Sequence, residues 1–218
     1  MKKVTIFICF VFSFLLIHAQ KKSDIGIFSG GSYYIGDINL ARQFYSPSIA
    51  VGGIYRYNIN LRYSLRGNIY YGGLKGDDLD FNNDYQIQRG ARFNASIIDC
   101  SIQFEFNFFP YQTTKKKNGY STYVTAGLGY TFFIGSDPSL NHLMIPFGVG
   151  FKININKRLS AGLEWDFRKT FSDNIDGLQN LSNTVYKSFI HNNDWYSFAG
   201  IFLTYRIFRY IEECPAYF

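Results

Sequence analysis

The feature that most constrains the fold of this chain is a regular alternation of apolar and polar residues. Between Ile98 and Phe108, every second side chain is apolar, and the residues between them are polar. Successive side chains of a β-strand point to opposite faces, so a period of two residues predicts strand rather than helix. The same alternation recurs in Ile145–Ile155 and Leu159–Phe167. These three segments predict an all-β fold.

Five further segments show the alternation less regularly, and Gly, Asn, Asp and Pro residues separate them, as is typical of consecutive strands. The total is eight, an even number, as in single-chain bacterial membrane barrels. We therefore expect a single antiparallel transmembrane β-barrel of about eight strands. The five additional strands are expected at Ile25–Gly36, Ser48–Tyr57, Arg62–Leu74, Thr122–Ile134 and Trp195–Phe208.

The connections alternate in length. Asn58–Leu61 and Asn156–Lys157 are short enough for tight turns, whereas Gly76–Gly90 and Phe171–Asn193 are long and polar. Membrane barrels place short turns on the periplasmic side and long loops outside. Pro110–Ser121 is the exception, because it is a basic periplasmic connection too long for a simple turn.

Periodicity alone does not say which face points inward. A soluble lipocalin-like barrel would enclose the apolar faces, and a membrane barrel would turn them outward to lipid. We favour the membrane barrel because aromatic residues make up 20% of the chain and eight such faces would overfill a small interior. The polar faces would then form a mixed-charge network in the lumen, comprising Arg66, Glu105, Lys152, Glu164, Asp166 and Arg168.

The N-terminus resembles an export signal. Lys2 and Lys3 precede an apolar run, Ile6–Ile17, and the small residue Ala19 precedes Gln20. The run is shorter than the ~20 residues of a membrane-spanning helix, which disfavours the alternative of an uncleaved anchor. We predict a signal peptide at 1–19, an outer-membrane barrel at 20–208 and a periplasmic tail at 209–218.

The charge of the chain does not indicate a nucleic-acid partner. The 22 basic residues and 16 acidic residues are spread along the sequence, whereas a nucleic-acid binder concentrates basic residues on one face. Two cysteines follow the signal, Cys100 and Cys214. A disulfide between them is not expected, because Cys100 falls in the middle of a strand and Cys214 in the tail.

No sequence pattern predicts catalysis. His142 and His191 fall in predicted outer loops, and with Ser136 and Asp137 they could form a hydrolase or acyltransferase site at the barrel mouth. Nothing in their spacing requires such a site, and the G-x-S-x-G motif is absent. We predict that the protein is not an enzyme, and a lipid-modifying barrel enzyme remains the least favoured alternative.

Metal and cofactor sites are not predicted either. The acidic segment Asp77–Asp84 lacks the ligand spacing of an EF-hand and is interpreted as a hydrated loop. Glu164 and Asp166 lie two residues apart on one strand face, where a carboxylate pair could act in catalysis. Because Arg168 follows on the same face, we interpret them as part of a structural salt-bridge network.

Several segments resemble a family of outer-membrane barrels from Bacteroidota that includes PorG of the type IX secretion system. The similarity follows the family's order over nearly the whole chain after the signal, although the predicted loop Gly135–His142 is shorter than in many relatives. The segments that carry the resemblance are Gly30–Asp37, Tyr55–Asn58, Phe104–Tyr111, Ile145–Gly150, Gly162–Trp165, Arg168–Asp173, Asn193–Gly200 and Cys214–Tyr217.

The resemblance implies a non-enzymatic scaffold in the cell outer membrane. Such a barrel would anchor a periplasmic ring made of a lipoprotein and a soluble partner, with outer-membrane lipid around its wall. The second function left open is a stand-alone surface barrel whose outer loops bind ligands or host surfaces. Candidate partner contacts at the periplasmic rim, chosen for their position, are Lys115, Lys116, Lys117, Tyr210, Cys214 and Tyr217.

Overall fold

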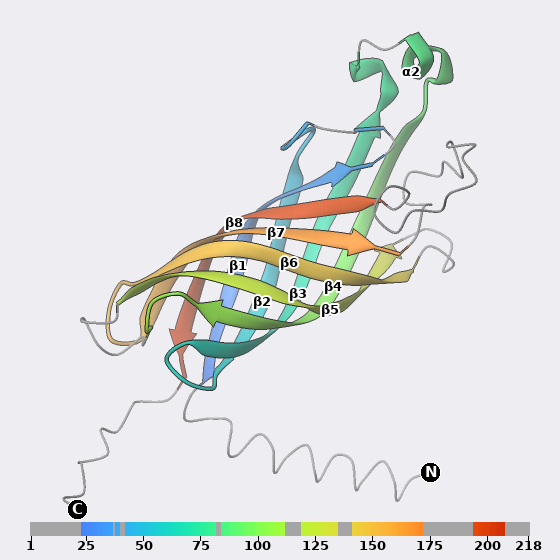
Figure 1. The fold of residues 1–218 in the computed structure, drawn as a ribbon. Helices are drawn as coiled ribbons and strands as arrows, with labels where there is room; N and C mark the ends of the chain where they lie inside the picture. Colours follow the sequence, from blue (N-terminus) through green and yellow to red (C-terminus); the bar gives the residue numbers. More distant parts are fainter. Residues whose placement is uncertain are drawn as a thin grey trace, which may run out of the picture.

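The computed structural model describes residues 23–36, 38–39, 42–81, 84–111, 119–134, 141–171 and 194–207. Each strand pairs antiparallel with its neighbours in sequence, and β1 also pairs with β8, so that the sheet closes into a barrel (Figure 1). The eight strands are β1 (Ser23–Ile35), β2 (Ser48–Asn58), β3 (Tyr63–Asp77), β4 (Arg92–Asn107), β5 (Tyr120–Ile134), β6 (His142–Asn154), β7 (Leu159–Thr170) and β8 (Trp195–Arg206). The predicted fold class is confirmed.

The predicted strand bounds differ most from the observed ones in β4, while β3, β6 and β7 each extend three residues beyond a predicted end. β3 continues to Asp77, and β4 begins at Arg92, six residues before the predicted start. Within the added ends, Lys75–Asp77 and Arg92–Asn94 pair only with each other, whereas Ser96 and Ile97 also pair with β5. In Arg92–Ile97 the apolar residues are Phe93, Ala95 and Ile97, which is the opposite phase to Ile98–Phe108, because these three side chains belong to or pack against the apolar core. The predicted loop Gly76–Gly90 also contains two short helical segments, η2 (Asp78–Asp80) and α2 (Asp84–Arg89).

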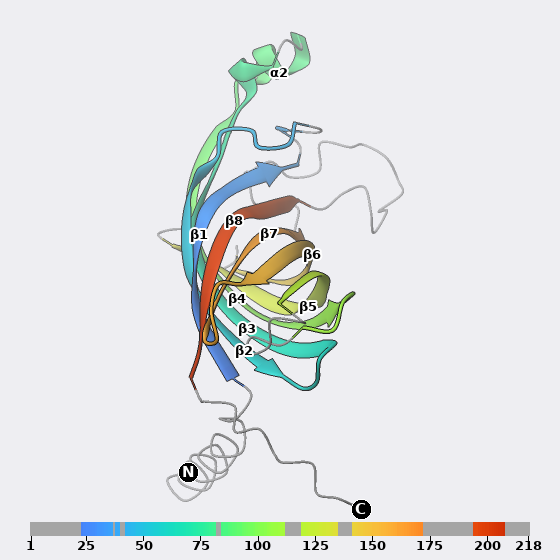
Figure 2. The same ribbon diagram turned by 90° about the vertical axis from the view of Figure 1, so that its left-hand side faces the viewer.

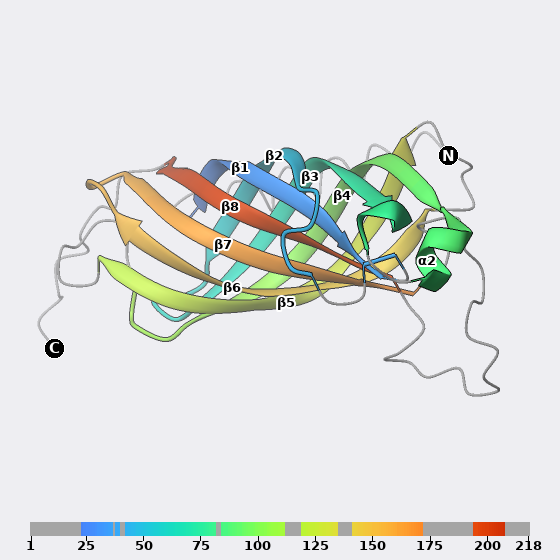
Figure 3. The ribbon, with the colours of Figure 1, turned by 90° about the horizontal axis from the view of Figure 1, so that it is seen from above.

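The outer wall of the barrel is apolar. Outward-facing side chains from all around the wall are strongly exposed, among them Ile27 at 65%, Ile49 at 81%, Ile102 at 63% and Leu128 at 68%. Seen from above, the strands cross the barrel at a steep tilt (Figure 3), as closure of a sheet requires. In the described part of the chain, no helix is long and apolar enough to cross a membrane.

The interior is filled with side chains. Charged and polar residues from several strands are fully buried, together with a cluster of aromatic and aliphatic side chains. Phe28 stacks on Tyr70 with ring centroids 4.5 Å apart, and Phe198 meets Tyr70 edge-on at 5.3 Å. An eight-stranded barrel has an interior just wide enough for such filling. The barrel therefore has a packed core and not an open channel.

One part of the molecule rises beyond the barrel. We call it the outer projection, and it consists of Gly72–Asp77 of β3, Arg92–Ile97 of β4, η2 and α2. It extends from the rim opposite to the start of β1 and the end of β8 (Figures 1 and 2). We call that rim the outer rim, because short turns such as 59–62 and 155–158 lie at the other, inner rim, the arrangement typical of the periplasmic side.

Candidate functional site

The lumen holds a network of paired charges. Five cations and five anions of the strands point inward and are almost completely buried, so that their charges balance. Moving an ion out of water costs several kcal/mol unless an opposite charge and hydrogen bonds compensate it. Each of these buried charges therefore needs an oppositely charged partner and hydrogen bonds inside the barrel. The members of the network are Asp24, Arg56, Arg66, Asp99, Glu105, Lys152, Glu164, Asp166, Arg168 and Arg206.

Arg66 is the centre of this network. Its guanidinium contacts Glu164, also donates to Gln103, and lies 3.2 Å from the Asp166 carboxylate. Glu164 in addition accepts hydrogen bonds from the hydroxyl groups of Tyr70 at 3.1 Å and Tyr123 at 2.7 Å. One cation from β3 thus holds two carboxylates from β7.

A second branch lies toward the inner rim. Glu105 on β4 accepts a hydrogen bond from Arg56 Nε at 3.0 Å and one from the Lys152 ammonium group. The Arg66 Nη1 atom is 4.0 Å from the same carboxylate. Glu105 therefore connects strands β2, β3 and β6 through a single side chain.

A third branch lies toward the outer rim. Arg168 Nε donates to Asp99 at 2.8 Å, and Arg168 Nη1 lies 3.1 Å from Asp166. Tyr196 donates to the same Asp99 oxygen at 3.0 Å. The structure thus brings together all six residues that were predicted to form the lumen network. It also places the hydroxyl groups of Tyr70, Tyr123 and Tyr196 in this network, which the alternation of apolar and polar residues did not indicate.

Side chains close both ends of the lumen. At the inner rim, Tyr111 is 95% buried, and its ring lies 4.4 Å from the Lys152 ammonium nitrogen. At the outer rim, the buried Tyr34 hydroxyl donates to Asp194 at 2.5 Å, and the Tyr34 ring packs edge-on against Phe93 at 4.9 Å. The interior is consequently unsuited to passage of a solute, and the surfaces open to partners are the two rims and the wall.

The outer projection has a buried ion pair of its own. Asp78 is fully buried and accepts two hydrogen bonds of 2.6 Å from the guanidinium of Arg89 and one of 3.0 Å from the Ala91 amide. These hydrogen bonds, the pair with Arg89 first, lower the pKa of the Asp78 carboxyl group. The carboxylate thereby ties the last residue of α2 to the end of β3.

The first loop, between β1 and β2, supports the projection. The Tyr45 hydroxyl donates to the Asp80 carboxylate at 2.6 Å, and the Arg42 guanidinium lies 4.9 Å from the centre of the Phe81 ring. Burial and the hydrogen bond to Asp80 raise the pKa of Tyr45 to about 12, so that its hydroxyl remains a donor throughout the physiological range. Ile38 of the same loop is fully buried, and Gln86 of α2 donates to its carbonyl at 2.9 Å.

The same loop also covers part of the outer wall. Phe44 packs against Tyr33 at 5.0 Å and stacks on Trp165 at 5.7 Å, and Tyr33 is fully buried beneath it. The Trp165 indole donates to the Tyr33 hydroxyl, which in turn donates to Gln43, each at 2.8 Å. Trp165, predicted to face lipid, is therefore partly covered by the protein's own first loop.

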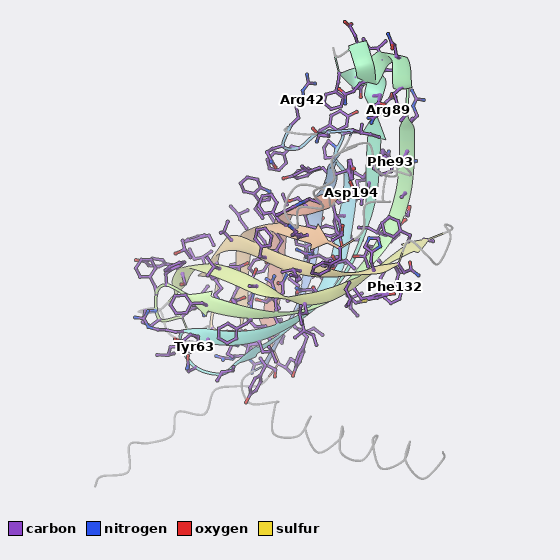
Figure 4. All side chains as sticks on the ribbon, turned by 45° about the vertical axis from the view of Figure 1, so that its right-hand side comes forward. Arg42, Tyr63, Arg89, Phe93, Phe132 and Asp194 are labelled. Atoms are coloured by element: carbon purple, nitrogen blue, oxygen red, sulfur yellow. The ribbon has the colours of Figure 1, made fainter. Side chains whose placement is uncertain are left out.

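The sequence did not indicate that the first loop, between β1 and β2, packs against the outer projection and the wall. The acidic segment after β3 was interpreted as a hydrated loop, and the structure shows instead that Asp78 is buried in an ion pair with Arg89. The available signal was the presence of large apolar residues, namely Ile38, Phe81 and Phe93, in segments expected to be polar. Figure 4 shows Arg42, Arg89 and Phe93 along the projection and Tyr63 at the opposite end of the molecule.

The other predicted site residues fall into two groups. His142 begins β6 rather than lying in a loop, and its ring packs against Phe133 at 5.5 Å. Cys100 is a free, half-buried cysteine on β4. Several other predicted residues lie outside the described part of the chain, and so does the signal peptide; these residues are Lys115, Lys116, Lys117, Tyr210, Cys214, Tyr217, His191, Ser136 and Asp137. Within the described ranges, no three His, Cys, Asp or Glu side chains are grouped to hold a metal ion.

Comparison with known proteins supports the fold. The model of a domain of unknown function, DUF6089, matches residues 2–216. The chain is similar in structure to the neisserial surface protein A, with a TM-score of 0.51, 9% identity, and coverage of 85% of this chain and 97% of that protein. This likeness shows an outer-membrane eight-stranded barrel fold. No curated protein matches the sequence.

Two further solved barrels are less similar. The attachment invasion locus protein Ail of Yersinia pestis matches with a TM-score of 0.46 and 13% identity, covering 84% of this chain and 96% of Ail. The N-terminal barrel domain of OprF from Pseudomonas aeruginosa matches with a TM-score of 0.45 and 12% identity, covering 84% of this chain and 97% of that domain.

Proposed function

The chain belongs to the DUF6089 family, and we propose that it is a non-enzymatic membrane anchor that works through its rims and not through its lumen. The observation that carries this proposal is the filled interior, in which Arg66, Glu105 and Glu164 are buried and contact one another and neighbouring side chains. A barrel with such an interior offers neither a channel nor a cavity for a substrate. What it offers is a rigid attachment in the outer membrane.

The more specific form of the proposal is a scaffold for a protein-secretion complex. It is supported by the sequence resemblance to the barrel family that includes PorG, which implies a periplasmic ring lipoprotein and a soluble partner. The residues proposed to contact these partners are the lysines at 115–117 and the tail from Tyr210 to Tyr217. The positive charge of the three lysines suits an acidic surface on a periplasmic protein, and the tail offers aromatic residues at both of its ends.

The test is co-purification from native outer membranes. Removal of residues 211–218 should leave the barrel folded, as judged by its shifted migration on unheated SDS gels, and should reduce recovery of the two periplasmic partners at least tenfold. Lys115→Glu should act in the same direction, while Lys75→Glu at the outer rim serves as the charge-matched control. Full recovery of both partners with the inner-rim variants would exclude the scaffold.

A second candidate function is recognition at the cell surface, which the outer projection favours. This element lies outside the lipid-facing wall and holds a buried ion pair, Asp78–Arg89, together with a support from the first loop through Tyr45. A membrane anchor alone needs no such ordered element. Replacing residues 75–94 by an Asn-Gly turn should leave secretion intact and abolish adhesion of whole cells to their partner surface; a secretion defect with unchanged adhesion would count against this candidate.

A further inference from the structure

The outer projection carries an unpaired strand edge. β3 and β4 pair with each other as far as Asp77 and Arg92. On one side, β2 pairs with β3 only up to Tyr71, and on the other side β5 pairs with β4 only from Ser96 onward. The two-stranded ribbon of β3 and β4 therefore continues past both of its neighbours, and each of its sides is a potential pairing edge.

The direction of the backbone groups follows from the hydrogen bonds around them. Asp78 N donates to Ala91 O across the ribbon at 2.9 Å, whereas Phe108 N donates to Thr122 O on the β5 side at 3.0 Å. Backbone groups of alternate residues in a strand point to opposite sides. The backbone N–H and C=O groups of the even-numbered residues of β4 thus point toward the β5 side. Arg92 and Asn94 are even-numbered residues that lie beyond Ser96, where the β4–β5 ladder ends. Neither residue has a backbone partner there in the described part of the chain.

The opposite edge is treated differently. On β3, the Ser32 hydroxyl donates to Gly73 O at 2.7 Å, and the Tyr45 hydroxyl, which donates to Asp80, accepts from Asp77 N at 3.2 Å. Between them lies the exposed side chain of Lys75, a charge of the kind that protects edge strands from pairing. The protein thus covers the β3 edge of the ribbon with its own side chains, whereas none of the described residues pairs with the β4 edge at Arg92 and Asn94.

We propose that the β4 edge at Arg92–Asn94 is a docking site for an extended polypeptide segment, which adds to the ribbon as a further strand. Free donors and acceptors at strand spacing are matched by another β-strand, and main-chain hydrogen bonds supply affinity in this mode of recognition. The proposal rests on the second function given above, surface recognition, and it names both the site and the chemical class of the partner.

Three further observations support this assignment. The ribbon is held rigid by the Asp78–Arg89 pair and by Tyr45, so that binding does not have to order it. The Arg92 guanidinium lies 2.5 Å from the Asp77 carboxylate across the ribbon, which keeps this charge engaged with β3. Asn94, the residue of the free edge next to the end of the β4–β5 ladder, is exposed and uncharged. Lipid does not suit the site, because acyl chains cannot satisfy backbone polar groups.

The experiment uses the full-length mature protein in detergent micelles, panned against a display library of random decapeptides. Asn94→Pro removes the N–H that faces the open edge and leaves the β3–β4 ladder intact, because the odd-numbered residues of β4 form that ladder. Lys75→Pro removes the corresponding N–H on the opposite edge and is the matched control. Migration on unheated SDS gels verifies that both variants fold.

We expect the selected peptides to bind the unmodified protein and Lys75→Pro with dissociation constants within twofold of each other, and Asn94→Pro at least tenfold more weakly. Bound peptide should slow hydrogen exchange at the Arg92 and Asn94 amides and not at the Lys75 amide. Equal affinity for Asn94→Pro, or failure to select any peptide, would overturn the proposal. Self-association that Asn94→Pro abolishes would overturn it in favour of a second copy of the chain. Failure here combined with lost adhesion of the 75–94 replacement would leave surface recognition standing and reject only the edge.

Discussion

The lumen and the outer projection both contain a buried carboxylate held by arginine, but they use it differently. In the lumen, Arg66 joins Glu164 and Asp166 within a network that reaches most of the strands. In the projection, Asp78 has a single cationic partner, Arg89, whose side chain is 12% exposed to solvent. Charges in the closed barrel depend on one another, because a group that loses its partner there is far from solvent. In the projection, which lies near solvent, loss of one partner should affect only the Asp78–Arg89 pair and its immediate neighbours.

The largest effect is expected from breaking the lumen network at its centre. Arg66→Met leaves Glu164 and Asp166 without their shared cation inside the barrel, and removal of one partner from a buried pair costs about 3–5 kcal/mol. The free energy of unfolding in lipid vesicles, followed by tryptophan fluorescence during urea titration, measures this loss.

The matched control is the double variant Arg66→Met with Glu164→Gln, which removes one charge of each sign. It should recover at least half of the lost stability, because buried pairs replaced together are often nearly neutral. A single variant that destabilises by less than about 1 kcal/mol would show that water reaches the network, in the range measured for solvated pairs.

An intermediate and local effect is expected from Asp78→Asn. The amide cannot sustain the charge-assisted pair with Arg89, and hydrogen bonds to charged groups contribute about 1.5–3 kcal/mol. Hydrogen exchange should accelerate in η2 and α2, while the unfolding midpoint of the barrel stays unchanged. Asp84→Asn, at an exposed position of α2, is the control. A lowered midpoint would contradict the separation of the two regions.

The smallest effect is expected from acid. Because the pKa of Asp78 is lowered in the folded protein, its contribution is fully present above its ordinary value of 3.8 and is lost as the pH falls through the still lower folded value. Exchange in the projection, corrected for the intrinsic rate, should therefore remain constant from pH 7 to pH 4 and increase below that. Asp78→Asn should show no such increase, and an equal increase in this variant would assign the effect to another group.

Some properties of this protein were determined by its sequence alone. The alternation in Ile98–Phe108 and its counterparts determined that the chain forms strands, about how many there are, and which side chains share a face, because a strand offers its side chains only two faces. The six predicted lumen residues follow from that geometry once the wall faces lipid. Because these residues include both basic and acidic side chains, a network of mixed charge could be expected from the sequence.

Other properties were decided only by the tertiary structure. Which cation meets which carboxylate depends on register between strands distant in sequence: Arg66 and Glu164 are 98 residues apart and meet across the lumen. The outer projection was likewise not predicted, because the alternation changes phase between Ile97 and Ile98, and only the packing of Phe93, Ala95 and Ile97 on the core explains that change. The burial of Asp78 and the packing of Phe44 on Trp165 depend on contacts between loops, and such contacts have no periodic signature because they form only when closure of the barrel brings the loops together.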